Sequence, residues 1–472
     1  MSAPFDPLTA LADTWRWSVR AQQCWAATLM APVGIERLQR ERLAELLRHA
    51  HAHCPFYREH HRGALDPALA LQAFEPVTKK ALMARFDDWV ADPRVRLDAV
   101  RRFVADPARI GEPYAGGHAI WTSSGSTGTP GIFVHDADAL AIYDALLATR
   151  LTAGGAISPL QALASGGRFA LVAALGGHFA GVVSWERLRR EFPLMGAATR
   201  SFSVLAPMRE LVAQLDAFAP AVIASYPTTL LLLAREREAG RMRTAPLALW
   251  SGGETMADVE RAEIARAFGC PVVDGYGASE CMNIAHDCGH GALHVNSDWV
   301  ILEPVNADRQ PVAAGERGAT VLLTNLANKT QPLIRYDLGD SVTFLDEPCA
   351  CASPFPAIRV DGRRDDIVAL DTRDGDTVPM APLALATVLE EGSGVHRFQI
   401  RQTGGRTLAV RFETPASDSR EQAWHRIERS LRAYLEQQGL RGIRIRCDDD
   451  PVQADPVSGK LREVLGLRAS RH

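Results

Sequence analysis

Small hydroxyl residues and glycines are concentrated in one stretch of the chain, residues 121–135, which reads WTSSGSTGTPGIFVH. The apolar start and β-branched end of this stretch predict a strand on each side of a loop. Glycine leaves backbone N–H groups unobstructed and the hydroxyls add donors, so the loop is suited to binding a polyphosphate. An ordinary Ser/Gly hairpin is the alternative. The lysine-bearing P-loop is excluded, because Pro130 and Gly131 stand where its lysine would be.

Two further glycine-rich segments each follow an apolar run that we predict to be a strand. Residues 252–254 read GGE, and residues 274–280 read DGYGASE. Their glycines would let a flat ligand approach the backbone, and each segment carries a glutamate. The second segment resembles the nucleophile elbow Gly-x-Ser-x-Gly, but Cys281 replaces the last glycine. We therefore do not interpret Ser279 as a hydrolase nucleophile.

Two groups of residues suggest metal ligands. His49 and His53 are spaced for one face of a helix, but a helix end with solvated histidines near its C-terminal dipole is the interpretation we favour. Farther along, three cysteines and a histidine form an S₃N set suited to structural zinc, with reduced surface cysteines as the alternative. This set is Cys288, His294, Cys349 and Cys351. The same loop also contains Cys281, His286 and His290.

Alternating apolar and helical segments position these groups. Residues 10–62 and 137–152 are predicted to be helical, with Thr78 as the N-cap of another helix. From residue 169 onward short apolar strands alternate with helices, which predicts a mostly parallel, helix-covered sheet with ligands at the carboxyl ends of its strands. The strands begin near residues 169, 221, 245 and 271, and the helices cover 207–218, 228–240 and 256–268. A strand-rich region follows residue 295, and a charged linker near residues 362–366 leads to a short α+β tail.

The composition is that of a folded protein of two or three domains. The chain has 472 residues, of which 47% are apolar and 23% charged, and its net charge of −4 gives no argument for nucleic acid or an anionic membrane. Its longest apolar stretch, residues 169–183, is interrupted and falls short of a bilayer span. No basic start precedes an apolar core at the beginning, so we expect no secretion signal. Eight dispersed cysteines suit a reducing cytoplasm.

Taken in order, the motifs resemble those of the adenylate-forming superfamily, which includes acyl-CoA synthetases, peptide-synthetase adenylation domains and luciferases. The series comprises the Ser/Thr/Gly loop at 122–130, GE at 253–254, YGASE at 276–280, RYDLGD ending at Asp340, GRRDD at 362–366 and SGK at 458–460. Within the superfamily the chain looks like the phenylacetate–CoA ligase branch, to which CPFYR at 54–58, PVTKK at 76–80 and DGYGASE are similar. The resemblance covers nearly the whole chain.

The resemblance implies an α/β fold with a large adenylate-forming domain of helix-covered mixed sheets, residues 1–362, and a small mobile α+β domain, residues 363–472. It also implies a two-step ligase reaction. A carboxylic acid attacks the α-phosphate of MgATP to give acyl-AMP and pyrophosphate, and a thiol then takes the acyl group. Some relatives in the phenylacetate–CoA ligase branch resemble this chain in its zinc ligand set.

Roles for individual residues follow from this resemblance. The phosphate loop would consist of Ser124, Gly125, Ser126, Thr127 and Gly128, with Thr127 also acting in catalysis. Glu280 would hold Mg²⁺, Asp340 would accept the ribose hydroxyls, and Arg363 would reach ribose or phosphate. The nucleotide slot would be formed by Gly252, Gly253, Glu254, Asp274, Gly275 and Tyr276. Lys460 would be the catalytic lysine, and Asp365 the hinge about which the small domain rotates.

The acid and the acceptor are less defined. The expected acyl pocket has walls that suit a flat aromatic acid, although an aliphatic acid stays open: His178, Phe179, Tyr226, Pro227 and Ala278. Residues 367–379 depart from the Gly-Val-Asn hairpin typical of phenylacetate–CoA ligases. The acceptor is therefore expected to be coenzyme A or, alternatively, the phosphopantetheine of an acyl carrier protein. A silent nucleotide-binding scaffold is the remaining alternative. We expect a cytoplasmic monomer or homodimer.

Overall fold

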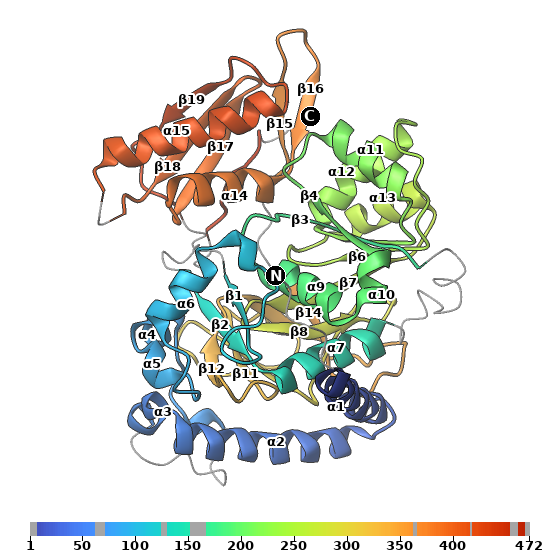
Figure 1. Cartoon of the computed structure of the whole chain (residues 1–472), viewed down its shortest axis with the longest axis vertical. Coiled ribbons are helices and arrows are strands. Elements are labelled where there is room, and N and C mark those ends of the chain that lie inside the picture. Colours follow the sequence, from blue (N-terminus) through green and yellow to red (C-terminus); the bar gives the residue numbers. More distant parts are fainter. Residues whose placement is uncertain are drawn as a thin grey trace.

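The computed structural model describes residues 7–61, 71–123, 130–151, 167–361, 366–415, 418–453 and 461–467. A large α/β part ends near residue 361, and a small C-terminal sheet domain is stacked at one end of it (Figure 1). The predicted domain boundary at 362/363 lies outside the described residues. None of the helices described is long and apolar enough to cross a membrane.

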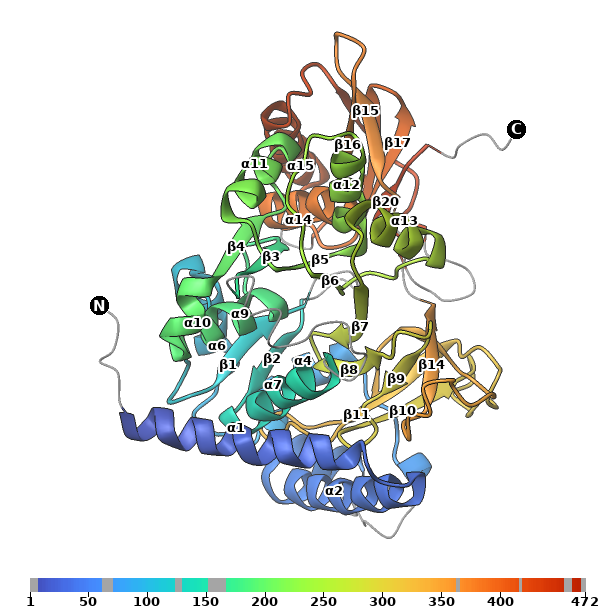
Figure 2. The same cartoon turned by 90° about the vertical axis from the view of Figure 1, so that its right-hand side faces the viewer.

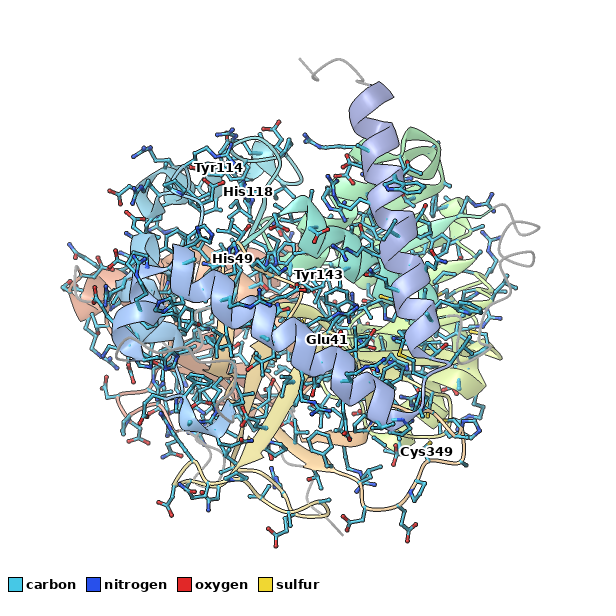
Figure 3. All side chains as sticks on the ribbon, turned by 90° about the horizontal axis from the view of Figure 1, so that it is seen from below. Glu41, His49, Tyr114, His118, Tyr143 and Cys349 are labelled. Atoms are coloured by element: carbon cyan, nitrogen blue, oxygen red, sulfur yellow. The ribbon has the colours of Figure 1, made fainter. Side chains whose placement is uncertain are left out.

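The N-terminal region is helical, as the sequence predicts. Two long helices, α1 (Pro7–Ala27) and α2 (Pro32–His53), lie across the face of the large part that is opposite the C-terminal domain (Figure 3). Proline in the first turn favours the start of α2. The predicted N-cap is confirmed, because the Thr78 side chain accepts a hydrogen bond from the Ala81 N–H. The shorter helices are α3 (Pro55–His60), α4 (Lys79–Ala84), α5 (Phe86–Trp89) and α6 (Leu97–Val104).

The central sheet has nine strands in the order β13-β14-β9-β8-β7-β6-β5-β3-β4. Its parallel part contains β4, β3, β5, β6 and β7. The apolar, largely buried runs of β3, β5 and β6 are typical of parallel strands covered by helices. These strands are β3 (Phe169–Ala173), β4 (Thr199–Ser203), β5 (Val222–Ser225), β6 (Ala248–Ser251) and β7 (Val272–Ala278). The connecting helices include α11 (Met208–Phe218), α12 (Pro227–Glu238) and α13 (Asp258–Phe268).

Strand β7 joins the two halves of this sheet. Its first residues pair in parallel with β6, with Ser251 opposite Asp274. Its later residues pair antiparallel with β8, with Tyr276 opposite Ala285. Figure 2 shows β7 running between the parallel part above and the antiparallel part below. The antiparallel strands are β8 (Cys281–Asp287), β9 (Leu293–Val295), β13 (Ser341–Phe344) and β14 (Ala357–Asp361).

Two smaller sheets complete the large part. Strands β10 (Val300–Val305), β11 (Thr320–Asn325) and β12 (Leu333–Asp337) form an antiparallel sheet. Strands β1 (Ala119–Thr122) and β2 (Ile132–His135) flank the Ser/Gly stretch and pair antiparallel, which confirms the two predicted strands; residues 124–129 between them lie outside the described part of the chain. Helix α7 (Ala137–Leu151) follows directly, close to its predicted position.

The region between β3 and α11 contains elements that the sequence did not predict. These are α9 (Ala180–Glu191), α10 (Pro193–Ala198) and the edge strand β4. The first turn of helix α9 contains Gly181, Val182 and Val183 after Ala180, and these three residue types have low helix propensity, so the start of the helix gives little local signal.

The C-terminal domain is a four-stranded sheet in the order β19-β18-β17-β20, packed with two helices and preceded by a hairpin. One continuous hydrophobic cluster includes residues of this domain and of the parallel part of the large sheet. Gln438 Nε2 also donates to the Leu205 carbonyl at 2.8 Å across the same contact. The elements are β15 (Val368–Asp371), β16 (Thr377–Met380), α14 (Pro382–Ser393), β17 (Phe398–Gly404), β18 (Thr407–Phe412), α15 (Arg420–Gln437), β19 (Arg444–Cys447) and β20 (Val464–Leu465).

A buried ion pair ties the N-terminal segment to the smaller antiparallel sheet. Arg335 on β12 is 4% exposed, and its Nε lies 3.1 Å from Glu303 Oε2 on β10. Its Nη1 donates to the carbonyls of Gln72 at 3.1 Å and Phe74 at 2.6 Å. One guanidinium therefore neutralises a buried carboxylate and satisfies two backbone acceptors of a distant segment.

We predict that Arg335→Ala lowers the free energy of unfolding by roughly 3–5 kcal/mol, because Glu303 would be left buried without a counter-ion. Urea unfolding followed by fluorescence measures the change. The double variant Arg335→Met with Glu303→Leu removes both charges and is expected to recover most of the loss. An equally large loss in the double variant would contradict the explanation.

Candidate active site

A cavity of about 1610 Å³ lies at the carboxyl ends of β3, β5, β6 and β7, where ligands bind in open α/β sheets. It reaches the C-terminal domain, whose helix α14 contributes Leu383, Ala386 and Thr387 to the wall. The volume exceeds the roughly 300–1000 Å³ of common small-molecule pockets. It has room for a nucleotide together with a second substrate.

The cavity brings together many of the residues that the sequence singled out. Those that line it are Phe179, Tyr226, Gly252, Gly253, Glu254, Asp274, Gly275, Tyr276, Ala278 and Asp340. The predicted residues that fall outside the described part of the chain are Ser124, Gly125, Ser126, Thr127, Gly128, Arg363, Asp365 and Lys460.

Three predicted residues lie apart from the cavity wall, as far as the described residues define it: His178, Pro227 and Glu280. His178 is 2% exposed, its Nε2 lies 3.1 Å from the Asp106 carbonyl, and its ring packs against Phe103. Pro227 is buried as the first residue of α12. Each of these two residues is adjacent in the chain to a residue that lines the cavity, His178 to Phe179 and Pro227 to Tyr226.

The predicted nucleotide slot is shaped by glycines and an aromatic pair. Gly253 has a φ of +83°, and a Cβ there would lie 3.2 Å from the Tyr226 ring. The Tyr276 hydroxyl donates to Asp340 Oδ2 at 2.7 Å, which joins β7 to the loop after β12. Burial, together with Asp340, raises the pKa of Tyr276 well above its usual value, so the phenol stays protonated as this donor.

The two carboxylates of the slot occupy different environments. Glu254 Oε2 accepts from the Thr228 N–H at 3.1 Å and the Thr228 hydroxyl at 2.8 Å, at the start of α12. Asp274 is enclosed, and burial raises its pKa to about 6, although Arg261 Nη2 lies 3.7 Å from its Oδ2. The Glu254 carboxylate is therefore fixed at the N-terminus of α12, where the helix dipole favours a negative charge, whereas burial brings the pKa of Asp274 to about 6.

Glu280 lies in the turn between β7 and β8, where buried partners fix its position. It is 6% exposed, and the Tyr336 hydroxyl donates to its Oε1 at 2.7 Å. Asn325 Nδ2 donates to the Glu280 carbonyl at 3.1 Å and to the Tyr143 hydroxyl at 2.8 Å. The carboxylate accepts from one neutral donor, the Tyr336 hydroxyl, and a neutral donor leaves the carboxylate charge available to a cation.

The start of the Ser/Gly stretch lies against this turn. Trp121 Nε1 donates to the Ser279 carbonyl at 2.6 Å, and the Ser279 hydroxyl lies 3.5 Å from the Thr122 carbonyl. The end of β1 and the turn that carries Glu280 are therefore neighbours, although 157 residues separate Thr122 from Ser279. The fold brings together the two segments predicted to bind phosphate and its metal ion.

Lys79, for which we predicted no role from the sequence, lies beside the start of the Ser/Gly stretch. Lys79 Nζ donates to Ser123 Oγ at 3.2 Å, directly before the undescribed loop residues. Its only signal in the sequence is its place in PVTKK, within the resemblance. A cation here would add positive charge where a polyphosphate is expected.

The predicted zinc ligands converge at the edge of the antiparallel part. The four ligand atoms of Cys288, His294, Cys349 and Cys351 lie within 4.8 Å of one another. Cys288 Sγ is 3.6 Å from Cys349 Sγ, close to the roughly 3.7 Å between two thiolates of a tetrahedral zinc site. Cys351 Sγ is 3.2 Å from His294 Nε2, and His294 Nδ1 lies 2.6 Å from the Phe355 carbonyl. That carbonyl orients the imidazole with Nε2 toward the sulfurs.

Two of the other candidate ligands of this loop are engaged elsewhere, whereas His290 is exposed and its Nδ1 lies 3.0 Å from the Cys288 carbonyl. Cys281 is 1% exposed in the core, and His286 Nδ1 lies 2.9 Å from Asn296 Oδ1. Hydrogen bonding, first from the Cys351 backbone, lowers the pKa of the Cys349 thiol to about 6. This favours the metal-binding thiolate form at Cys349, whereas burial raises the pKa of Cys288 to about 11 and also raises that of Cys351. The donor set and its geometry fit a four-coordinate structural zinc ion.

The sequence is similar to those of known acid–CoA ligases. No family model matches the sequence. The chain is 25% identical over 460 residues to the phenylacetate-coenzyme A ligase of Thermus thermophilus, covering 92% of this chain and 97% of that protein. It is 27% identical over 353 residues to the phenylacetate-coenzyme A ligase of Escherichia coli K12, covering 71% and 72% of the two chains.

A solved structure shares the fold across both parts of the chain. The 2-hydroxyisobutyryl-CoA ligase in complex with 2-HIB-AMP and CoA superimposes with a TM-score of 0.58 at 22% identity, covering 93% of this chain and 91% of that chain. The same ligase in its postadenylation state with 2-HIB-AMP gives a TM-score of 0.54. Together with the sequence relatives, these findings show that the chain is an enzyme of the adenylate-forming superfamily.

Proposed function

We propose that the protein is an AMP-forming acid–thiol ligase that activates an aromatic carboxylic acid and transfers the acyl group to coenzyme A. The observation that carries this proposal is the cavity in which Tyr276 and Asp340 meet at the carboxyl ends of the parallel strands. The turn that carries Glu280 lies beside the start of the Ser/Gly stretch. Similarity to phenylacetate-coenzyme A ligases along 92% of the chain supports the reaction class.

In the first half-reaction a carboxylate oxygen of the acid attacks the α-phosphorus of ATP. The bond between the α-phosphorus and the bridging oxygen breaks, and the electron pair leaves with pyrophosphate. We propose that residues 124–128 and Lys79 bind the leaving phosphates, while Asp340 accepts the ribose hydroxyls. Mg²⁺ bound near Glu280 would neutralise phosphate charge. Lys460 would stabilise the charge that develops at the α-phosphate.

In the second half-reaction the thiolate sulfur of coenzyme A attacks the acyl carbon and AMP leaves. The proposed acid pocket is the part of the cavity between α7 and α9, whose large apolar walls suit a flat ring. These walls are formed by Leu140, Leu147, Phe179, Trp185, Leu188 and Met282.

A carrier protein is the second candidate acceptor. Residues 367–379, which form the hairpin β15–β16, differ in sequence from the corresponding hairpin of typical phenylacetate–CoA ligases. Parallel assays with coenzyme A and with a phosphopantetheinylated carrier protein distinguish the two acceptors. ATP–pyrophosphate exchange across a panel of aromatic and aliphatic acids, without thiol, tests adenylation itself. No exchange with any acid would contradict the proposed function.

We predict that Lys460→Ala abolishes carboxylate-dependent ATP–pyrophosphate exchange while ATP still binds, because the lysine would stabilise the transition state of adenylation only. Exchange and ATP affinity are measured on the same preparation. Lys329→Ala, which removes a cation paired with Glu45 outside the cavity, serves as the control and should keep wild-type exchange. Wild-type turnover in Lys460→Ala would refute its role.

We predict that Asp340→Asn raises the KM for ATP by roughly 10- to 100-fold, because a neutral amide loses the charge-assisted hydrogen bonds to ribose. Steady-state kinetics at saturating acid measure the change. Asp337→Asn is the matched control, since Asp337 lies three residues earlier but does not line the described cavity. Equal effects of both substitutions would argue against ribose binding by Asp340.

We also propose that Cys288, His294, Cys349 and Cys351 bind one structural zinc ion. Four protein ligands leave no open position, so the ion would act in stability alone. Purified protein is expected to contain about one equivalent of zinc by elemental analysis. Cys351→Ser should lose the metal and lower the melting temperature, whereas Cys447→Ser, outside the cluster, should keep it. Zinc-free protein prepared without chelator would refute the site.

A further inference from the structure

One carboxylate lies among the apolar walls of the proposed acid pocket. Asp144 is on α7 between Leu140 and Leu147, and all three residues line the cavity. Residues three and four positions apart lie on the same face of a helix, so this carboxylate has a leucine on either side. Trp185 and Leu188 of α9 line the same cavity. A carboxylate oxygen in such surroundings is costly to leave without a hydrogen-bond partner.

The protein supplies a partner for one of the two Asp144 oxygens. Arg187 Nη2 on α9 donates to Asp144 Oδ2 at 2.6 Å. Among the described residues, none donates a hydrogen bond to Asp144 Oδ1. The Asp144 side chain is 17% exposed and belongs to the cavity wall. Its Oδ1 is therefore an acceptor that a molecule in the cavity can use.

The positive charge of Arg187 is shared between two acids. Its Nη1 donates to Glu191 Oε2 at 2.5 Å, so one guanidinium is paired with both Asp144 and Glu191. The three groups together keep one negative charge when both acids are ionised. Burial raises the pKa of Asp144, although Arg187 acts in the opposite direction. A further hydrogen-bond donor at Oδ1 would stabilise the ionised carboxylate.

Neighbouring polar side chains of this wall are already paired. Arg189, the other charged residue that α7 and α9 contribute to the described cavity wall, donates from Nη1 to both oxygens of Glu186, at 3.0 Å and 2.8 Å. Asn283 Nδ2 donates to the Tyr143 carbonyl at 2.9 Å. Asp144 differs from Arg189 and Asn283 because the atom it leaves unused is a carboxylate acceptor.

We propose that Asp144 determines the specificity for the acid: its carboxylate accepts a hydrogen bond from a hydroxyl or amino group on the aromatic ring of the substrate. This inference rests on the proposed adenylation of an aromatic acid and names its substrate class. A site with a buried acceptor rejects a ring that leaves the acceptor unpaired. A methoxy ring is rejected for the same reason, because its oxygen carries no hydrogen.

The test compares acids that differ in one ring substituent. The panel consists of benzoic and phenylacetic acids that carry a hydroxyl, an amino, a methoxy or no group at each ring position. Acid-dependent ATP–pyrophosphate exchange gives kcat/KM for each acid. In the wild-type enzyme we expect the best hydroxyl or amino acid to exceed its methoxy and unsubstituted counterparts by about 10- to 100-fold.

Asp144→Asn tests the residue directly. The amide oxygen would accept from Arg187, which leaves the Nδ2 donor in place of the unused acceptor. The ratio of kcat/KM between the preferred acid and its unsubstituted counterpart should fall to about one. A general loss of stability would lower both rates together and leave this ratio unchanged. The KM for ATP should stay within about twofold of the wild-type value.

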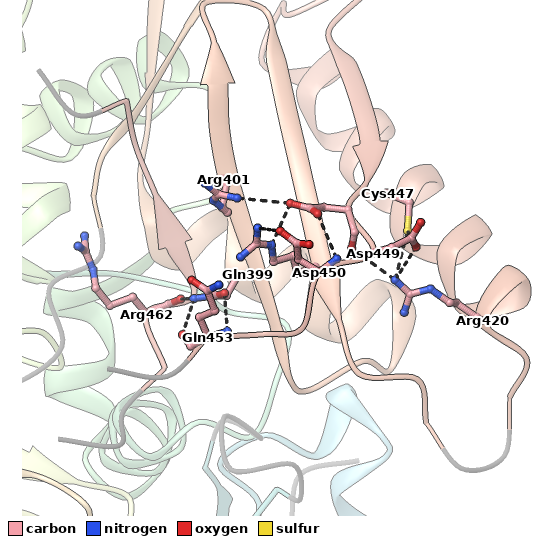
Figure 4. Close-up of polar contacts among 10 residues, drawn as sticks. Gln399, Arg401, Arg420, Cys447, Asp449, Asp450, Gln453 and Arg462 are labelled. Atoms are coloured by element: carbon pink, nitrogen blue, oxygen red, sulfur yellow. Dashed lines mark hydrogen bonds and ion pairs between the residues drawn. The ribbon is translucent and has the colours of Figure 1, made fainter. Parts of the chain in front are cut away.

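Asp448→Asn is the matched control. Asp448 is also 17% exposed and is also paired with a buried arginine, because Arg411 Nε donates to its Oδ2 at 2.9 Å. It belongs to an arginine–aspartate network of the C-terminal domain, of which Arg401 and Asp450 are labelled in Figure 4. It is not among the described residues that line the cavity. This variant should keep the wild-type ratio.

Equal kcat/KM values for all substituents in the wild-type enzyme would overturn the inference, and so would a preference for methoxy acids. An unchanged ratio in Asp144→Asn, or an equal fall in Asp448→Asn, would overturn it as well. If Asp144→Asn is insoluble, the wild-type panel decides.

A wild-type enzyme that adenylates no acid would refute the proposed function separately. Calorimetric titration of the same acids, with α,β-methylene ATP present, would then still decide about Asp144. The preference for a ring donor is expected in Kd as well, because the hydrogen bond forms on binding. Equal Kd values for all substituents, or no binding of any acid, would overturn the inference.

Discussion

The site depends on the hydrogen bonding of one strand, β7. Its N-terminal residues bond to β6 in parallel and its C-terminal residues bond to β8 antiparallel, so the chain must change partner geometry within Val272–Ala278. This change places Asp274, Gly275 and Tyr276 at the point where the parallel part of the sheet ends. The strand also ends in the turn that carries Glu280. Any shift of register in β7 would displace the predicted nucleotide slot and the predicted magnesium ligand Glu280 together.

Local sequence patterns were sufficient to predict much of the fold. The apolar runs of β3, β5 and β6, the apolar start of β7, the flanking helices and the cap at Thr78 are encoded over short distances and could be predicted. The polar edge strand β4 and the weakly helical start of α9 could not, because tertiary contacts rather than propensity determine them.

Some features of the candidate site could likewise be predicted from the sequence, and others could not. Glycines and carboxylates at strand ends indicated the cavity, and cysteine spacing indicated the metal ligands. The sequence does not indicate that the His178 side chain contacts Asp106 while the Phe179 side chain lines the cavity. Which way each of two neighbouring side chains points depends on the fold around them. Likewise the contact of Lys79 with Ser123 joins segments far apart in the chain. Such pairings are set by packing, which no single-sequence pattern records.

The residues around Asp366 link two parts of the C-terminal domain that the sequence separates by almost a hundred positions. Asp366 forms an ion pair with Arg462 at 2.6 Å, its N–H donates to the Val464 carbonyl, and the Gly466 N–H donates to its carboxylate. It directly follows the predicted hinge at 365. Strand β20, which follows residues 454–460, is therefore tied directly to the residue at which the described C-terminal domain begins. Any movement of the backbone at residue 366 would be shared by β20.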